Sequence, residues 1–131
     1  MSRQLSVSGV VVFGDLIGWR LGYPTANIQC NDIPAELTDG VYAARIDYNG
    51  TQYDGMLVVG DENRRKPGVK KVELHLFDFS GNLYGEKLSA TVVKRIRTFR
   101  PFHSEKELIA QIAKDCAEGR KILKSASRKR L

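Results

Sequence analysis

The fold is decided by the stretch GVYAARIDYNGTQYDGMLVV, residues 40–59. Residues 40–48 are rich in β-branched, aromatic and other apolar side chains, as strands are. Asn49-Gly50 follows them and is the strongest short-range signal for a β-hairpin. Residues 51–59 then predict the returning strand. The stretch therefore predicts two antiparallel strands joined by a tight turn.

Further strand-like runs lie on both sides of this hairpin, at residues 7–13, 71–79 and 88–96. Turn signals separate these runs, and no helical pattern lies between them, so parallel βαβ units are not expected. Antiparallel strands that close into a small barrel leave no exposed edge. The pattern therefore indicates a mainly β barrel. Residues 15–37 and 60–70 form long irregular stretches, where function tends to lie.

One helix is predicted near the C-terminus, because Ser104 and Glu107 have the spacing of a capping box. Its apolar face is expected to pack on the barrel through Leu108, Ile109, Ile112, Ala113 and Cys116. Gly119 is expected to weaken the helix near its end. We expect one domain over residues 1–124 and a basic tail over residues 125–131.

The overall composition is that of an ordinary globular chain of 131 residues, with 42% hydrophobic and 27% charged residues. No apolar run is long enough to cross a bilayer, and no signal-peptide pattern follows the first residues. Cys30 and Cys116 have no ligand spacing, so they are interpreted as reduced thiols. These features lead us to expect a cytoplasmic protein without a membrane partner.

The net charge of +6 is confined to the end of the chain. Residues 120–131 contain six basic side chains and no acidic one, and the other 15 basic residues balance the 15 acidic ones. Lys and Arg suit a helix C-terminus, where the helix dipole is negative. No aromatic residues are interleaved with these charges, as they are in many sites for single-stranded nucleic acid. A nucleic-acid partner is therefore not favoured.

Candidate chemistry begins at the turn Pro24-Thr25-Ala26-Asn27. Pro24 fixes its own φ angle, and Gly22 allows close approach of the backbone. Thr25 and Asn27 then present two side-chain oxygens, which suit a hard cation and phosphate groups. The same residues are also compatible with an ordinary loop entering a strand.

A second candidate is the strand segment 72–76, in which Glu73 and His75 alternate with apolar residues. Alternation predicts that both side chains share a face, where Glu73 is a candidate general base. A solvent-facing pair on a one-sided strand is the alternative. Thr25, Asn27 and Glu73 supply what phosphoryl transfer requires, provided the fold brings them together.

These blocks, in this order, resemble those of the riboflavin kinases, including the kinase module of bifunctional bacterial FAD synthetases. The resemblance runs from about Gly9 to Leu123. It includes residues 21–28, 40–42, 72–75, 77–79 and 83–86, and it ends with Ile96-Arg97, Phe102, Ser104, Leu108, Ile112 and Asp115. The resemblance implies a six-stranded antiparallel Greek-key β-barrel with a packed C-terminal α-helix.

The resemblance also implies an activity, which is transfer of the ATP γ-phosphate to the ribityl 5′-hydroxyl of riboflavin, with Mg²⁺, to give FMN and ADP. It makes Glu73 the catalytic base and gives Thr25 and Asn27 to the metal. The implied nucleotide-binding residues are Gly18, Arg20, Gly22, Pro24, Thr25 and Asn27. Arg97 and Phe102 fall in a flap near the flavin. A monomer is expected.

Two departures from the family pattern leave a second interpretation open. Trp19 stands where the family often has an arginine, and the loop after Gly60 is altered. The alternative is a barrel that binds flavin or nucleotide without efficient catalysis. A small nucleic-acid-binding barrel is a third interpretation, which the neutral body of the chain disfavours.

Overall fold

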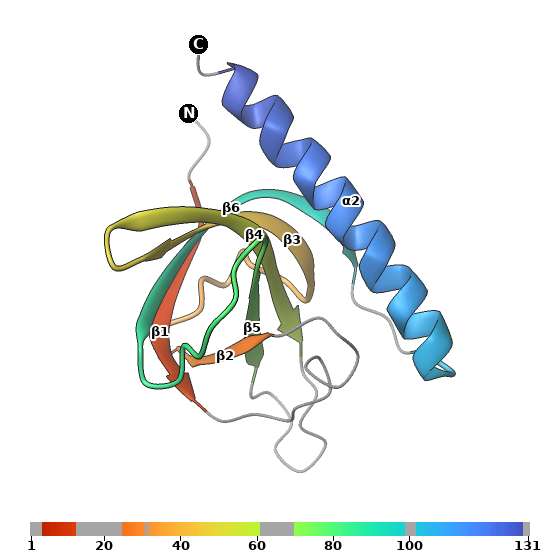
Figure 1. Cartoon of the computed structure of the whole chain (residues 1–131). Coiled ribbons are helices and arrows are strands. Elements are labelled where there is room, and N and C mark those ends of the chain that lie inside the picture. Colours follow the sequence, from red (N-terminus) through yellow and green to blue (C-terminus); the bar gives the residue numbers. More distant parts are fainter. Residues whose placement is uncertain (1–3, 13–24, 31, 61–69, 99–101, 130–131) are drawn as a thin grey trace.

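The computed structural model describes residues 4–12, 25–30, 32–60, 70–98 and 102–129. Six strands form a closed barrel in the order β1-β2-β5-β4-β3-β6, and every neighbouring pair is antiparallel (Figure 1). The strands are β1 (Ser6–Val12), β2 (Ala26–Gln29), β3 (Gly40–Tyr48), β4 (Thr51–Gly60), β5 (Lys71–Leu76) and β6 (Lys87–Thr98). One helix, α2 (Glu105–Lys129), follows them. The predicted fold class is confirmed.

The connections are of the Greek-key type. Strands β3, β4 and β5 are consecutive neighbours, and β6 returns to lie beside β3, which gives the spatial order β6-β3-β4-β5. The hairpin between β3 and β4 is the one that the sequence predicts. Asn49 and Gly50 have φ angles of 50° and 81°, as a two-residue turn with both central φ angles positive requires.

Two strands differ from their predicted extents. Strand β2 lies within residues 15–37, where an irregular stretch was predicted. Strand β5 ends at Leu76 and not at residue 79, because the chain turns at Asp78, whose φ angle is 57°. The turn breaks the predicted alternation, since Phe77 is buried beneath α2 while Phe79 packs against the interior of the barrel.

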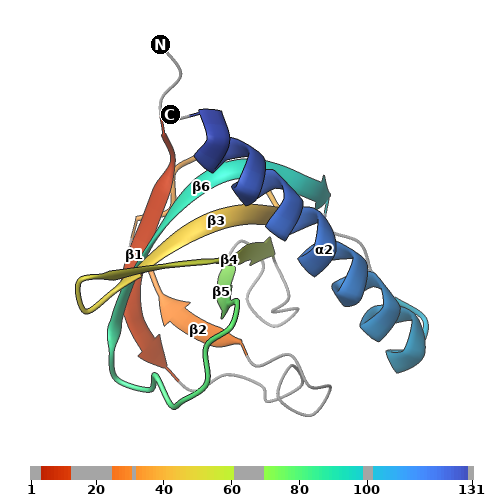
Figure 2. The same cartoon turned by 45° about the horizontal axis from the view of Figure 1, so that its top comes forward.

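The interior of the barrel is apolar, with Ile46, Leu57, Leu74 and Leu88 fully buried. Strand β3 is buried on both faces, because Ala44 and Ile46 face the interior while Val41 and Ala43 lie in a second apolar cluster beneath the helix. This second cluster fixes α2 against β3, β4 and β6 (Figure 2). The main contacts of α2 do not include β1, β2 and β5, which form the other side of the barrel.

Helix α2 begins as predicted, since the Glu107 N–H donates to Ser104 Oγ at 3.1 Å. The predicted packing face is wrong in part, because Ile109 and Ala113 are exposed. The face is rotated so that Asp115, Gly119 and Leu123 are buried at successive turns.

Gly119 lies within the helix and permits its close approach to the barrel. A Cβ atom there would lie 3.3 Å from Phe77 Cζ and 3.4 Å from Ile96 Cδ1, which is tighter than ordinary packing. The glycine therefore sets the distance between α2 and the barrel, and does not mark the end of the helix.

Helix α2 continues past residue 124, where the basic tail was expected to begin. Arg45 Nη2 donates to Leu123 O at 3.1 Å and to Ser127 Oγ at 2.8 Å, while Arg45 Nη1 pairs with Asp54 Oδ1 at 2.9 Å. The last turns of the helix are thus attached to the barrel as far as Ser127. Within the described part of the chain, no helix has the length and apolar character needed to cross a membrane.

Candidate active site

Strands β2 and β5 bring together two of the residues that the sequence singles out. Asn27 of β2 lies directly opposite Glu73 of β5. Directly opposed residues of an antiparallel pair have Cβ atoms about 4.5–5.5 Å apart and share a face of the sheet. Their neighbours Ala26, Val72 and Leu74 face the interior of the barrel. Asn27 and Glu73 therefore stand side by side on its outer face.

Asn27 carries a polar atom that the surrounding protein leaves unsatisfied. The residue is only 8% exposed, and its buried Oδ1 atom has no hydrogen-bond partner among the described residues. A buried acceptor without a partner costs about 1–3 kcal/mol. Groups of this kind need an explanation, and an ion or ligand donor at the site is one.

Glu73 is held by a neighbour on its own strand. Lys71 Nζ lies 3.0 Å from Glu73 Oε1, and the two side chains are 25% and 17% exposed, respectively. This contact could not be predicted from the sequence, because a lysine at a strand end usually indicates a solvated position. His75, the next residue on this face, packs its ring edge-on to Phe77 at a centroid distance of 5.7 Å.

A continuous cross-strand row on the outer face links Glu73 to Arg97. From Glu73 the row passes to Val58 of β4, then to Val41 of β3, and then to Arg97 of β6. Three inter-strand steps of about 4.8 Å each, along the curved wall of the closed barrel, separate the backbones of Glu73 and Arg97. Asn27 lies beside Glu73 at the β2 end of this row. The five residues from Asn27 to Arg97 are called the outer row. It aligns the candidate base and the candidate flavin residue at one level of the barrel.

Arg97 is fixed by the helix. Its Nε atom donates to Asp115 Oδ1 and Oδ2 at 2.9 and 3.0 Å, and Gln111 Nε2 donates to Asp115 Oδ1 at 2.9 Å. The Asp115 side chain is 3% exposed. The guanidinium carbon of Arg97 lies 5.5 Å from the centre of the Phe102 ring. The two predicted flavin residues thus lie together, and Asp115 is an addition that helix periodicity did not indicate as a buried site residue.

The other predicted residues are placed less fully. Thr25 is half-buried and lies directly before β2, two residues from Asn27. The predicted nucleotide residues Gly18, Arg20, Gly22 and Pro24 lie outside the described residues. The two departures from the family pattern, Trp19 and the loop after Gly60, lie outside them as well. The juxtaposition of Asn27 and Glu73 does not depend on any of these positions.

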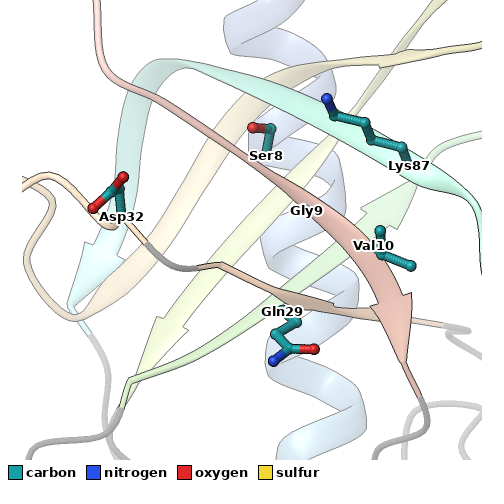
Figure 3. Close-up of a pocket in the computed structure, with 6 residues that line it drawn as sticks. All are labelled: Ser8, Gly9, Val10, Gln29, Asp32 and Lys87. Atoms are coloured by element: carbon teal, nitrogen blue, oxygen red, sulfur yellow. The ribbon is translucent and has the colours of Figure 1, made fainter.

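A separate groove of about 450 Å³ opens on the barrel where β1 lies between β2 and β6 (Figure 3). It is lined by Ser8, Gly9, Val10, Gln29, Asp32 and Lys87. None of the predicted site residues lines this groove. Gln29 is its nearest link to the outer row, since it lies two residues from Asn27 on β2. In the described ranges, no three His, Cys, Asp or Glu side chains are grouped as metal ligands.

Comparison with known proteins connects this geometry to a family. The family model described as riboflavin kinase, or flavokinase, matches residues 1–123. A bifunctional riboflavin kinase/FMN adenylyltransferase from Bacillus subtilis is 36% identical over 121 residues, which are 90% of this chain and 38% of that protein. The chain therefore spans well under half of the length of that curated relative.

Two solved structures share the fold. The crystal structure of a macrolide-efflux protein from Streptococcus pneumoniae aligns with a TM-score of 0.79 and 32% identity, over 88% of this chain and 38% of that one. The crystal structure of riboflavin kinase from Trypanosoma brucei aligns with a TM-score of 0.62 and 22% identity, over 94% of this chain and 82% of that one. The second likeness supports the fold alone.

Proposed function

Because the chain belongs to the riboflavin kinase family, we propose that it transfers the γ-phosphoryl group of ATP to the 5′-hydroxyl of riboflavin, giving FMN and ADP. The family model covers nearly the whole chain, which supports this activity. The proposal concerns only the kinase activity in the name of the bifunctional relative, because the matched residues are those of the riboflavin kinase model.

The observation that carries the proposal is the pairing of Asn27 with Glu73 on the outer row. An unsatisfied neutral oxygen lies beside a carboxylate, so a site for a cation and phosphate adjoins a site for a hydroxyl group. Phosphoryl transfer depends on this kind of positioning, since little covalent chemistry is left for the protein. A simple flavin-binding barrel would not need both groups.

The residues at the Asn27 end fit Mg²⁺. Magnesium prefers oxygen ligands and often uses few from the protein, and in the described part of the chain the buried Oδ1 atom of Asn27 has no hydrogen-bond partner. We infer that Asn27 and Thr25 hold Mg²⁺, and that Gly18, Arg20, Gly22 and Pro24 surround the nucleotide with them. When bound, the ion neutralises charge on the phosphates of ATP.

Glu73 acts on the acceptor in this proposal. A primary alcohol is too weak an acid to ionise beforehand, so the carboxylate orients the hydroxyl group and takes its proton as the new O–P bond forms. The bond between the γ-phosphorus and the β–γ bridging oxygen breaks, and its electron pair leaves with ADP. Glu73 then releases the proton to water, which restores the carboxylate.

The flavin ring is assigned to the Arg97 end of the outer row. Phe102 offers an aromatic face for stacking, and Arg97 offers donors to the polar edge of the ring. The proposed enzyme is a monomer whose substrates are small molecules.

Incubation of the purified chain with riboflavin, ATP and Mg²⁺ tests the activity, with FMN and ADP measured by chromatography. We expect equal amounts of the two products. Glu73→Gln should lower kcat about 10²–10⁴-fold, because it removes the proton acceptor, and should leave riboflavin binding largely intact. Glu118→Gln, at an exposed position of α2, is the matched control and should retain full turnover.

Two results would reject parts of this proposal. Flavin binding by the wild-type chain without any FMN would leave only the non-catalytic binding barrel. Full turnover by Glu73→Gln would remove Glu73 as the base, whatever the wild-type activity.

A further inference from the structure

Asp115 is a buried carboxylate that the proposed reaction does not use. Its side chain is 3% exposed, yet it projects from α2 and accepts hydrogen bonds from Arg97 Nε and Gln111 Nε2. A buried carboxylate is costly unless it is paired and hydrogen-bonded. An apolar residue could fill such a position in the helix face at less cost. The retained charge therefore calls for a role, and its contacts point to Arg97.

The contacts of Arg97 with the described residues use its Nε and Nη1 atoms. Nε is bonded to both oxygens of Asp115, and Nη1 donates to the Thr98 carbonyl at 3.2 Å. Within the described residues, Nη2 has no hydrogen-bond partner. The Arg97 side chain is 19% exposed, and the Phe102 ring lies close to its guanidinium group. A planar donor is thus held in one orientation beside an aromatic ring.

A second arginine–aspartate pair joins α2 to the barrel and provides a contrast. Arg120 of α2 makes two hydrogen bonds to Asp78, at 2.9 and 3.1 Å. The side chains of Arg120 and Asp78 are 50% and 79% exposed, respectively, so this pair is a surface contact. Both pairs fasten the helix, but only the Asp115 pair is buried and lies on the outer row with Glu73.

We propose that Asp115 is a positioning residue that, supported by Gln111, fixes Arg97 so that Nη2 donates to a carbonyl oxygen on the edge of the flavin ring. This inference rests on the proposed function. It adds that the helix acts on recognition of the flavin ring, and not of the ribityl chain. Arginine suits the task because its fork of donors is rigid, and a bound carboxylate at Nε determines where the remaining N–H groups point. The helix thereby determines affinity for the ring without touching the reacting atoms.

Asp115→Asn tests the proposal, because it keeps the size of the side chain and removes the charged acceptor. We expect KM for riboflavin and the flavin Kd, measured by fluorescence quenching, to rise roughly tenfold, the equivalent of about 1.4 kcal/mol. The value of kcat should stay within about twofold, and KM for ATP should not change. Asp78→Asn is the matched control and should leave every one of these constants unchanged.

A double-mutant cycle separates positioning from a general loss of structure. Arg97→Lys keeps a positive charge but lacks the fork, so it should raise the flavin Kd by a similar factor. Asp115→Asn should then add little in the Arg97→Lys background, because the two residues act as a unit. Gln111→Met, a milder change in the same contact, should give a smaller rise in Kd if Asp115→Asn fails to fold.

The outcomes distinguish this inference from the proposed function. Unchanged flavin Kd in Asp115→Asn, or fully additive effects in the cycle, would overturn the positioning role even if the wild-type chain makes FMN. If Asp115→Asn binds flavin more weakly but the wild-type chain makes no FMN, the positioning role of Asp115 is supported and the kinase activity is rejected. A wild-type chain that binds no flavin would overturn both.

Discussion

The two ends of the outer row are built differently. At one end, Asn27 has a buried oxygen beside Glu73 that no described residue hydrogen-bonds. At the other end, Asp115 accepts hydrogen bonds from Arg97 and Gln111, so this carboxylate is satisfied before any ligand arrives. The same barrel level therefore carries an unsatisfied site and a satisfied one.

The contrast between the two ends predicts which properties each substitution should change. A buried polar group without a partner lowers stability, so replacing it with an apolar group should affect ligand chemistry and spare the fold. A satisfied buried network holds the helix to the barrel, so disturbing it should change both stability and flavin affinity. The chemical end and the ring-binding end should therefore be separable by mutation.

The largest effect is expected from Asn27→Leu. The substitution removes the proposed metal ligand, whose loss should cost several kcal/mol of transition-state stabilisation and lower kcat/KM about a hundredfold or more. The melting temperature should hold or rise, because the unpaired buried oxygen is replaced by an apolar group. Steady-state kinetics and thermal unfolding measure the two effects on one preparation.

Gln29→Leu is the control for Asn27→Leu, because Gln29 is an exposed residue of the same strand. Its turnover should match that of the wild type. A large loss of stability in Asn27→Leu with unchanged catalysis would contradict this prediction, because Asn27 would then support the fold and not the reaction.

A smaller effect is expected at Gly119, one helical turn beyond Asp115. Gly119→Leu places a side chain where a Cβ atom alone would lie 3.3 Å from Phe77 Cζ, so the helix must move away from the barrel. Overpacking of this kind costs about 1–3 kcal/mol, and the shifted helix should weaken flavin binding through Arg97. Denaturant unfolding and fluorescence titration check the two consequences.

Gly119→Ala provides the graded comparison. Alanine gains about 1 kcal/mol of helix propensity, which should offset much of the crowding. Equal stability of the alanine and leucine variants would show that Gly119 does not set the approach of α2.

The smallest effect concerns the exposed pair of Asp78 and Arg120. The hydrogen bond and the charge of Arg120 lower the pKa of Asp78 below its ordinary value. A carboxyl group whose pKa is lowered by folding contributes stability above its unfolded pKa, and loses it as the pH falls through the folded pKa. Asp78→Asn should therefore lower the melting temperature slightly at pH 7 and not at all in strong acid. A difference that widens with acidity would contradict this account.

Much of the fold could be predicted because its signals are local. Asn49-Gly50 has the backbone freedom that its tight turn needs, so the β3–β4 hairpin follows from residues adjacent in sequence. Ser104 and Glu107 likewise mark the start of α2 by a contact within one turn. Such features need no knowledge of what packs against them.

The features that the sequence could not predict depend on distant contacts. Strand β2 has four residues and a mixed polar pattern, and its pairing with β5 is what places Asn27 opposite Glu73. The helix face was misassigned because Asp115 is buried through its pairing with Arg97, which apolar periodicity cannot register. Thr25, Asn27 and Glu73 could be chosen from the sequence, but not their arrangement.

A crystal structure of the chain with riboflavin, ADP and Mg²⁺ would show whether Asn27 and Glu73 have the proposed roles. We predict the ribityl 5′-oxygen within about 2.6–3.2 Å of a Glu73 carboxylate oxygen, and Asn27 Oδ1 within about 2.0–2.1 Å of the ion. The flavin ring should lie toward Arg97. A 5′-oxygen at the Arg97 end, or an ion held away from Asn27, would contradict the account.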